Sequence, residues 1–238
     1  MRITTNQAYG PHPRQRADVY APSKASNETV IIFWHGGSWQ RGDKKSYHYV
    51  GRALVRLGYT VVIPNYRLYP EVVWPVFAED AALAVAFAKH RLKPKRLVAM
   101  GHSAGGQIAG AVAFDSTYLR AIGEAGAIDG FIGLAGGYDF DPARSLRPIL
   151  ETGEQSWRTT KLINQLPVPA LLVHGQMDAI VRPHVSVLLA KALKEHGGRV
   201  DMLNYRFQSH FTILAPFIVG LWSAPKLRTT LARFVDSL

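Results

Sequence analysis

The segment Gly-His-Ser-Ala-Gly-Gly at residues 101–106 restricts the fold of this chain more than any other feature of its sequence. A short apolar run of strand character precedes it at residues 96–100, and residues 107–114 have the composition of a buried helix. A strand, a tight glycine turn and a helix form a nucleophile elbow, which places the central serine hydroxyl on a strained corner beside the first N–H groups of the helix. Ser103 is therefore the candidate nucleophile, and a serine in an ordinary glycine-rich turn is the alternative.

Along the whole chain, apolar runs alternate with helical patterns, which predicts an α/β fold with a mostly parallel sheet and helices on both faces. We expect strands at residues 30–34, 59–63, 97–100, 127–134, 170–173 and 200–203. We expect helices at residues 44–57, 75–90, 107–114, 184–196 and 226–238. The length of 238 residues suits a single domain over 1–238, with an N-terminal arm at 1–28 and a small lid at 139–167.

Composition and charge exclude several classes of protein. The chain has no cysteine, which excludes disulfides, a thiol nucleophile and thiolate metal sites. The net charge is +11, but the basic residues are scattered in small clusters, so we expect a solvated basic surface and no nucleic-acid partner.

The most apolar stretch, 211–222, is short and contains Pro216 and Gly220, so no membrane span is expected. The N-terminus lacks the apolar core of a signal peptide, which favours a cytoplasmic protein, although a removed export signal stays open.

A serine hydroxyl is nearly inert at neutral pH and needs a base, an acid that orients the base, and donors for an oxyanion. After a nucleophile elbow, the acid and then the histidine follow along the chain, each beyond the end of a later strand. Asp178 follows the apolar run 170–173 and a turn, so it is the candidate acid. Asp139 is the next alternative, and capping of the helix near Arg182 is the structural role open to Asp178. The other aspartates considered are Asp129, Asp141 and Asp201.

The base is chosen from nine histidines. His210 follows the last expected strand, in a loop that precedes apolar helical sequence, and is the candidate base. We expect His102 to point away from the nucleophile and His35 to fix its own glycine loop by hydrogen bonds. His174 ends a strand. The remaining histidines flank a helix or lie far from the other candidates: His12, His48, His90, His184 and His196.

The oxyanion donors are expected from the sequence His-Gly-Gly-Ser-Trp at 35–39, directly after the first strong strand. Glycines there allow the backbone to approach a tetrahedral oxygen closely. We expect the N–H groups of Gly37, Ser38 and Ala104 to donate, with Gly36 shaping the turn. Two aromatic residues at strand ends are candidate substrate-binding residues, Trp39 and Tyr66. For Trp39, packing of the loop is an equal alternative, and for Tyr66 a structural role is the stronger one.

These motifs resemble the α/β-hydrolase superfamily, and the loop at 35–39 resembles that of arylformamidases (kynurenine formamidases) and related short-chain carboxylesterases. Further segments fit the same pattern: Tyr9-Gly10-Pro11, Asp18-Val19-Tyr20, Asn65-Tyr66 and Tyr138-Asp139. The resemblance implies a triad of Ser103, Asp178 and His210, no metal and no organic cofactor. The chain departs from the hormone-sensitive-lipase pattern, because Ser38 replaces a third glycine, and its length leaves no room for a large cap.

The resemblance and the motifs together predict a serine hydrolase that cleaves short-acyl carboxylic esters through an acyl-enzyme. The alternative reaction is that of an arylformamidase, acting on N-formylkynurenine or similar formyl aryl amides. A catalytically silent homologue that binds a small ligand in the same cleft is the non-enzyme alternative. The expected partner is a small-molecule ester or formyl amide, and a homodimer is left open.

Overall fold

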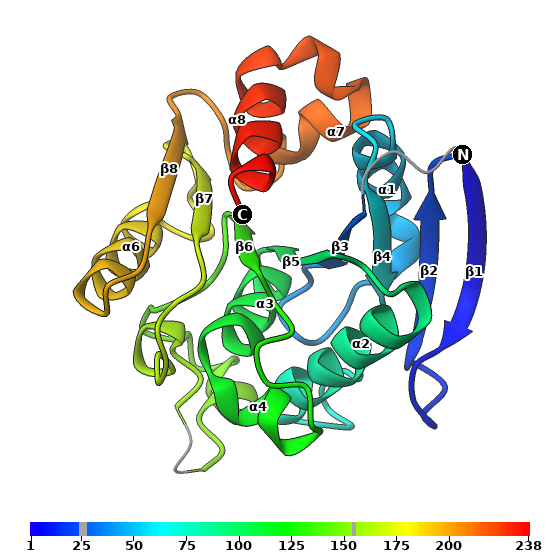
Figure 1. Ribbon diagram of the computed structural model, residues 1–238. Coiled ribbons are helices and arrows are strands. Elements are labelled where there is room, and N and C mark those ends of the chain that lie inside the picture. Colours follow the sequence, from blue (N-terminus) through cyan, green and yellow to red (C-terminus); the bar gives the residue numbers. More distant parts are fainter. Residues whose placement is uncertain (24–27, 154–155) are drawn as a thin grey trace.

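The computed structural model describes residues 1–23, 28–153 and 156–238, and these form one eight-stranded sheet in the order β1-β2-β4-β3-β5-β6-β7-β8 (Figure 1). The strands are β1 (Arg2–Ala8), β2 (Arg16–Ala21), β3 (Thr29–Trp34), β4 (Thr60–Pro64), β5 (Arg96–His102), β6 (Gly130–Leu134), β7 (Ala170–Gly175) and β8 (Val200–Tyr205). The run from β4 through β8 is parallel, whereas β1 and β2 pair antiparallel at one edge. The predicted mostly parallel α/β sheet is confirmed.

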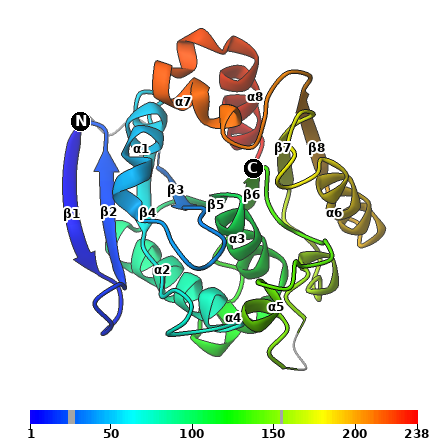
Figure 2. The ribbon, with the colours of Figure 1, turned by 180° about the vertical axis from the view of Figure 1, so that it is seen from behind.

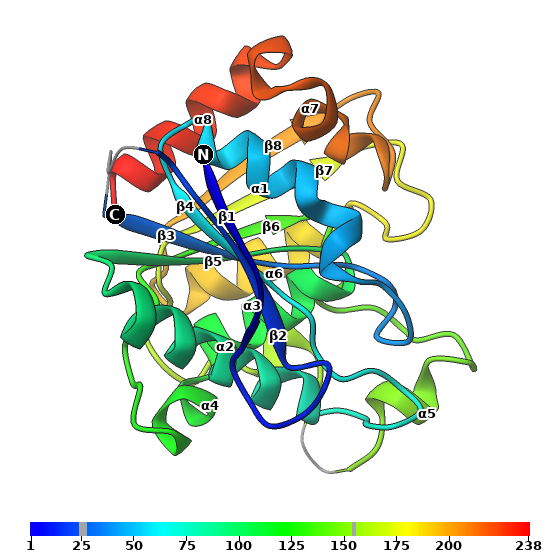
Figure 3. The same cartoon turned by 90° about the vertical axis from the view of Figure 1, so that its right-hand side faces the viewer.

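Helices cover both faces of the sheet (Figure 3). One face packs against α2 (Val76–Leu92), α3 (Ala104–Phe114) and α6 (His184–Glu195), and the other against α1 (His48–Val55), α7 (Ala215–Val219) and α8 (Pro225–Asp236). The remaining helical turns are short: η1 (Lys44–Tyr47), α4 (Ser116–Ala121), α5 (Arg147–Leu150), η2 (Thr159–Lys161), η3 (Thr212–Leu214) and η4 (Leu221–Ser223). Among the described residues, no helix has both the length and the apolar character needed to cross a bilayer.

The central strand β3 shows why its sequence is a continuous apolar run. Val30, Ile32 and Trp34 point into the layer that contains α2 and α3, while Ile31 and Phe33 point into the layer of α1 and α8. All five side chains are buried, because a parallel strand with helices on both faces has no side exposed to water. The strand predicted from this run is therefore confirmed, one residue longer at its start.

The sheet brings together segments that are far apart in the sequence. Because β3, β5, β7 and β8 are parallel, their carboxyl ends lie at the same edge, and the loops that follow them meet there. Figure 2 shows the sheet from behind, with β1 at one side and β8, flanked by α6, at the other. These loops carry most of the residues that the sequence singles out.

At three places the structure adds to the sequence predictions or differs from them. The N-terminal arm pairs as β1 and β2 along the edge of the sheet next to β4. The expected helix at 44–57 begins as the 3-10 turn η1, whose first turn is capped by the Asp43 carboxylate accepting from the amide of Lys45, and becomes α-helical only at His48. Helix α4 is not predicted from the sequence, although the Asp115 carboxylate caps it by accepting from the Thr117 amide.

The proposed boundaries of the arm and of the lid include residues outside the described part of the chain, namely 24–27 and 154–155. The rest of the segment 139–167 is mostly irregular, with only α5 and η2 as regular turns. A lid function for this segment stays a prediction.

Candidate active site

The turn between β5 and α3 has the geometry of a nucleophile elbow. Ser103 lies between the last residue of β5 and the first residue of α3, with φ +55° and ψ −123°. This left-handed conformation is strained for a residue with a side chain, and such strain is typical of functional positions. A Cβ at Gly101 would lie 2.1 Å from the Gly105 carbonyl oxygen, and a Cβ at Gly105 would lie 2.1 Å from the Trp34 carbonyl oxygen. The two glycines are therefore required for α3 to pack this closely on β3 and β5.

Three side chains from separate loops form one chain of hydrogen bonds. His210 Nε2 lies 2.9 Å from Ser103 Oγ, and His210 Nδ1 lies 2.8 Å from Asp178 Oδ2. Because a carboxylate oxygen only accepts, Nδ1 carries the hydrogen, and Nε2 of the neutral ring is free to accept the serine proton. The structure thus brings together all three residues that the sequence predicts as nucleophile, acid and base.

The Asp178 carboxylate is fully buried, and each of its oxygens accepts two hydrogen bonds. Oδ1 accepts from the amides of Ile180 and Val181, both at 2.9 Å, and Oδ2 accepts from His210 and, at 3.2 Å, from His174. Burial alone would raise the pKa of Asp178, but the hydrogen bonds from His174, His210 and the Val181 amide outweigh it and hold the pKa well below its usual range. The carboxylate therefore stays ionised.

The loop after β3 turns sharply next to the serine. Gly37 has φ +135°, and a Cβ there would lie 1.9 Å from the Arg41 carbonyl oxygen, so the turn requires glycine. Ser38 continues with φ +52°. Across the ranges that the structure describes, no acceptor is paired with the amide of Gly37, Ser38 or Ala104. These three N–H groups, which the sequence predicts as oxyanion donors, are thus available to a ligand.

Gly36 lies directly behind the serine. A Cβ on Gly36 would be 3.1 Å from Ser103 Cβ, from His102 Nδ1 and from Tyr47 Oη. Real Cβ contacts are rarely this close, so any side chain at this position would push the glycine loop away from the elbow. The absence of a side chain at Gly36 thus allows the glycine loop to lie against the elbow.

A cavity of about 500 Å³ opens onto Ser103. Its apolar walls come mainly from three loops and the start of α6, and they include Trp39, Phe140, Leu146, Ile180, Val181 and Val185. Trp39 is held in place because its Nε1–H donates to Gln107 Oε1 over 3.1 Å. The polar groups on the walls are those of Ser38, Ser103, Asp141, Arg182 and His184. Such a lining suits an apolar group next to a polar reacting centre.

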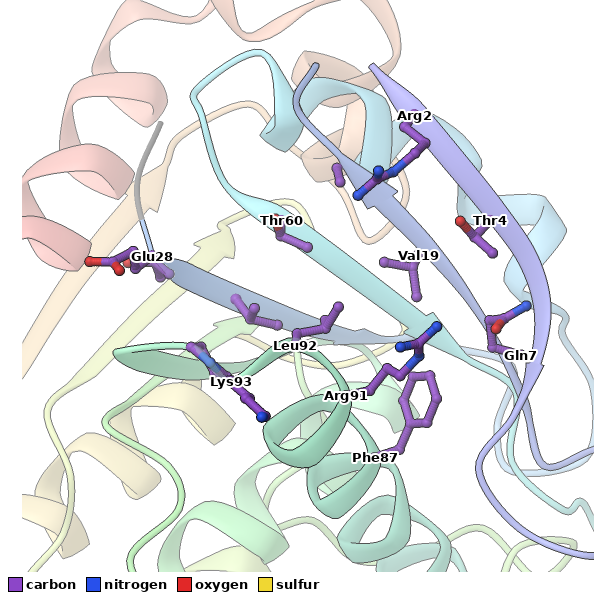
Figure 4. Close-up of a pocket in the computed structure, with 14 residues that line it drawn as sticks. Arg2, Thr4, Gln7, Val19, Glu28, Thr60, Phe87, Arg91, Leu92 and Lys93 are labelled. Atoms are coloured by element: carbon purple, nitrogen blue, oxygen red, sulfur yellow. The ribbon is translucent and has the colours of Figure 1, made fainter. Parts of the chain in front are cut away.

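A larger cavity of about 610 Å³ lies at the other end of the sheet, between β1, β2 and the end of α2. Figure 4 shows Phe87 and Arg91 of α2 facing β1 and β2 across it. None of the candidate catalytic or oxyanion residues lines it. The candidate substrate cavity is therefore the smaller one, because the candidate nucleophile, Ser103, lines it. A choice based on volume alone would have selected the other cavity.

The contacts of Tyr66 are those of a structural residue, the stronger of the two roles that the sequence left open. Its side chain is fully buried and does not line the cavity at Ser103. Its hydroxyl donates to the His35 carbonyl over 3.0 Å, and its ring stacks on the His35 ring at 4.5 Å. The physical reason is that β4 lies next to β3, so the residue after β4 packs under the glycine loop and supports it. Burial lowers the pKa of His35 to about 4, so the stacked ring is neutral.

The rival aspartates have other partners. The Asp139 carboxylate accepts from the Arg158 guanidinium and the Thr160 hydroxyl, and the Asp129 carboxylate accepts from the Leu97 amide. Both therefore hold neighbouring segments together, away from the candidate base. Asp141 lies in the cavity wall, and Asp201 is exposed on β8.

Two histidines have contacts that the sequence does not predict. His102 does not point away from the site: its ring lies 4.8 Å from the His210 ring, and Nε2 lies 2.9 Å from the His210 carbonyl oxygen. His174 contacts the candidate acid. In the sequence, only the spacing of four residues between His174 and Asp178 could have indicated that these two side chains are in contact. For His102 there is no such signal, because its partner is 108 residues away.

No group of three or more His, Cys, Asp or Glu side chains suited to a metal ion is found within residues 1–23, 28–153 and 156–238. The groups that meet at Ser103 are a hydroxyl, an imidazole, a carboxylate and amide donors. These are the components of nucleophilic acyl transfer.

Family comparisons cover most of the chain. Residues 78–219 match the model of the prolyl oligopeptidase family, and residues 17–126 match the BD-FAE model. A truncated form of a carbohydrate esterase from gut microbiota has a similar structure, with a TM-score of 0.79, 18% identity and coverage of 90% of each chain. The predicted α/β-hydrolase fold is confirmed.

Two curated relatives have similar sequences. A probable isoprenylcysteine alpha-carbonyl methylesterase of Arabidopsis thaliana is 26% identical over 88% of this chain and 57% of its own length. Kynurenine formamidase of Danio rerio is 26% identical over 88% of this chain and 75% of its own length. The chain spans between 49% and 58% of the length of the plant methylesterases that it matches.

Proposed function

The chain belongs to the prolyl oligopeptidase family, and we propose that it is a serine hydrolase that cleaves short-acyl carboxylic esters. The observation that carries the proposal is the hydrogen-bonded series Ser103 Oγ, His210 and Asp178, with distances of 2.9 and 2.8 Å. A proton can pass from the serine to the imidazole along this series without any movement of the backbone. The names of the relatives, which include methylesterases and a carbohydrate esterase, support an ester substrate.

In the proposed reaction, Ser103 Oγ attacks the acyl carbonyl carbon while His210 Nε2 takes the hydroxyl proton. The carbonyl oxygen becomes an oxyanion and accepts hydrogen bonds from the amides of Gly37, Ser38 and Ala104. His210 then gives its proton to the leaving alcohol as the carbon–oxygen bond breaks. A water molecule, deprotonated by the same imidazole, attacks the acyl-enzyme; the bond between the acyl carbon and Ser103 Oγ then breaks, His210 returns the proton to Oγ, and the acid leaves. Asp178 stays ionised throughout and holds the ring in the required tautomer.

The cavity supports a small apolar acyl or alcohol group. It has a volume of about 500 Å³, in the lower half of the usual range of about 300–1,000 Å³ for small-molecule sites. The side chains of Leu146, Val181 and Val185 form apolar parts of its wall, next to the polar side chains named above. A short acyl chain is therefore the best fit.

Hydrolysis of a formyl aryl amide is the second candidate. Two observations favour it: the kynurenine formamidase relative and the aromatic side chains of Trp39 and Phe140 in the cavity wall. An aryl leaving group could stack on these rings while the small formyl group occupies the space at Ser103. The ratio of kcat/KM on N-formylkynurenine to kcat/KM on a short aryl ester decides between the two reactions, and a preference of about a hundredfold is decisive.

The test of the proposal is the Ser103→Ala variant. We expect turnover of p-nitrophenyl acetate to fall by about 10³-fold or more, with the unfolding temperature unchanged within a few degrees. The wild-type protein should also be labelled on Ser103 by a fluorophosphonate. Turnover that persists in the variant would overturn the proposed nucleophile. An ordered wild-type protein that takes no label would favour the ligand-binding alternative.

A further inference from the structure

The buried imidazole of His102 has no part in the proposed proton transfer, yet both of its ring nitrogens have partners. His102 Nε2 lies 2.9 Å from the His210 carbonyl oxygen, and Nδ1 lies 3.2 Å from Tyr47 Oη. The residue is only 1% exposed. Burial, followed by the nearby His210, lowers the pKa of His102 to about 3, so the ring is neutral at ordinary pH.

The direction of each hydrogen bond in this group follows from the chemistry of its atoms. A carbonyl oxygen can only accept, so His102 Nε2 carries the hydrogen. A neutral imidazole has one N–H, so Nδ1 must accept, and the Tyr47 hydroxyl must donate to it. The opposite tautomer would set a nitrogen lone pair against the carbonyl oxygen of His210. The Tyr47 oxygen then accepts from the Gly36 amide, which lies 3.2 Å away.

The result is an unbroken series: Gly36 N–H to Tyr47 Oη, Tyr47 O–H to His102 Nδ1, and His102 Nε2–H to the His210 carbonyl. It connects the glycine loop after β3, the elbow after β5 and the loop that carries the candidate base. These segments are far apart in sequence, and they carry the oxyanion donors, the nucleophile and the base of the proposed reaction.

We propose that His102 is a positioning residue. It holds the backbone of His210, and through Tyr47 the glycine loop, at fixed positions relative to Ser103. This inference rests on the proposed function, because it assigns His102 a role in that same reaction. His102 does not act as a base itself, since its Nε2 carries the hydrogen and its Nδ1 faces Tyr47.

Packing around the series supports this role. The Tyr47 ring is held against Phe33, with ring centroids 5.4 Å apart, and against the His102 ring at 6.1 Å. The space that a Cβ on Gly36 would occupy is bounded by Tyr47, His102 and Ser103 at equal distances of 3.1 Å. The glycine loop, the tyrosine and the elbow are therefore in direct contact, and a shift of one would move the others.

Two substitutions at residue 102 separate the two hydrogen bonds of the ring. The terminal nitrogen of glutamine lies as many bonds from Cα as histidine Nε2, so His102→Gln keeps a donor for the His210 carbonyl. The amide oxygen of asparagine corresponds to Nδ1, so His102→Asn keeps the acceptor for Tyr47 and loses the bond to His210. The introduced glutamine and asparagine are otherwise alike, because both side chains are uncharged primary amides.

The assay is hydrolysis of p-nitrophenyl acetate, with kcat and KM measured separately. We expect His102→Asn to lower kcat by about 10- to 100-fold and His102→Gln by no more than about threefold. KM should stay within about twofold in both variants, because neither Tyr47 nor His102 lines the cavity. Equal losses of kcat in the two variants, or a His102→Asn enzyme within about threefold of wild type, would overturn the inference.

A second variant tests the series through Tyr47. We expect Tyr47→Phe to lower kcat by about 3- to 10-fold, and to cost less in a His102→Gln background, where its acceptor is already missing. Tyr59→Phe is the control, since Tyr59 is a tyrosine of the same apolar layer, more deeply buried (2% exposed) than the partly buried Tyr47, and is not a member of the series; its kcat should equal that of wild type. The same cost of Tyr47→Phe in both backgrounds would show that the two residues act independently.

The outcome for Ser103→Ala separates this inference from the proposed function. An inactive Ser103→Ala enzyme with a fully active His102→Asn enzyme would remove the role of His102 and leave the nucleophile in place. An active Ser103→Ala enzyme would remove the proposed function itself. The rate of fluorophosphonate labelling of Ser103 should fall in parallel with kcat in His102→Asn, which gives a readout independent of the choice of ester.

Discussion

His174 donates its Nε2–H to Asp178 Oδ2 over 3.2 Å, to the same oxygen that accepts from His210 over 2.8 Å. The Nε2–H is shared with the Val181 carbonyl at 2.9 Å, and Nδ1 accepts from the Ser186 hydroxyl at 2.7 Å. The carboxylate is thus held from both sides, and its pKa is depressed partly because of His174.

Replacement of His174 by leucine should weaken the fold at neutral pH, where the Asp178 carboxylate is ionised, and should move acid unfolding to a higher pH. A depressed carboxyl pKa contributes stability above the unfolded pKa, and this contribution is lost as pH falls through the folded pKa. With one donor removed, the folded pKa of Asp178 rises, so the contribution is lost at a higher pH. We expect His174→Leu to unfold at a higher pH in acid titrations and to lose about 1–3 kcal/mol of unfolding free energy at pH 7. His196→Leu, at an exposed helix end, should change neither value, and identical acid titrations for the two variants would contradict the prediction.

Replacement of Gly37 by alanine should lower turnover far more than it lowers stability. The Cβ would need the space of the Arg41 carbonyl oxygen, which is 1.9 Å away, so the amides of Gly37 and Ser38 would move from the proposed oxyanion position. We expect kcat to fall by about 10²- to 10³-fold. Gly153→Ala is the control, because no atom of the described residues, apart from Gly153 and its chain neighbours, lies within 4 Å of a Cβ at Gly153, and its substitution should leave kcat unchanged. Steady-state kinetics on a short aryl ester measure both, and a Gly37→Ala enzyme with normal kcat would exclude this loop from the reaction.

A larger residue at Val185 should shorten the acyl chain that the enzyme accepts. Val185 lies in the cavity wall at the start of α6, whereas Val187 on the same helix is 54% exposed and lies outside the cavity. We expect Val185→Phe to lower kcat/KM for a hexanoate ester by about tenfold relative to an acetate ester, and Val187→Phe to leave this ratio unchanged. A series of p-nitrophenyl esters gives the ratios. An unchanged chain-length profile in Val185→Phe would place the acyl group elsewhere.

The neutral, buried His35 should make the protein less stable in mild acid. Burial lowers its folded pKa to about 4 from an ordinary value of 6.5, so the unfolded chain binds an extra proton between these values, and stability falls as pH falls through this window. Asparagine at this position keeps a donor for the Gly36 carbonyl and does not titrate. We expect the unfolding free energy of His35→Asn to depend less steeply on pH between about 6.5 and 4 than that of wild type. Urea titrations at a series of pH values test this, with His196→Asn as the exposed control; equal slopes would show that His35 is not the group responsible.

Several parts of the fold follow from the sequence for clear physical reasons. Strands covered on both faces are continuous apolar runs, as in β3, and the carboxyl ends of parallel strands meet at one edge. This is why the positions of Ser103, Asp178 and His210 could be predicted to lie together without knowledge of the connecting loops. By contrast, β1 is largely exposed and has no apolar alternation, so it carries no strand signal.

Other contacts could not be predicted, because they depend on which strands become neighbours. Tyr66 follows a strand end, as catalytic residues do, and only the pairing of β4 with β3 shows that its ring lies under the glycine loop. The bond between His102 and His210 joins residues 108 positions apart, and no local pattern indicates it. Local sequence thus indicates which groups reach the edge of the sheet, whereas their partners depend on the tertiary arrangement.

Gly105 permits α3 to contact the Trp34 carbonyl, and this contact has a consequence for the redesign of substrate preference. At Gly105 the first turn of the helix rests on main chain, so backbone atoms of two adjacent strands set the direction of the serine. Most of the other side chains on the cavity wall come from the irregular stretch before α5, the loop after β7 and the start of α6. Substrate preference can therefore be redesigned, or drift during evolution, while the geometry of attack is inherited unchanged.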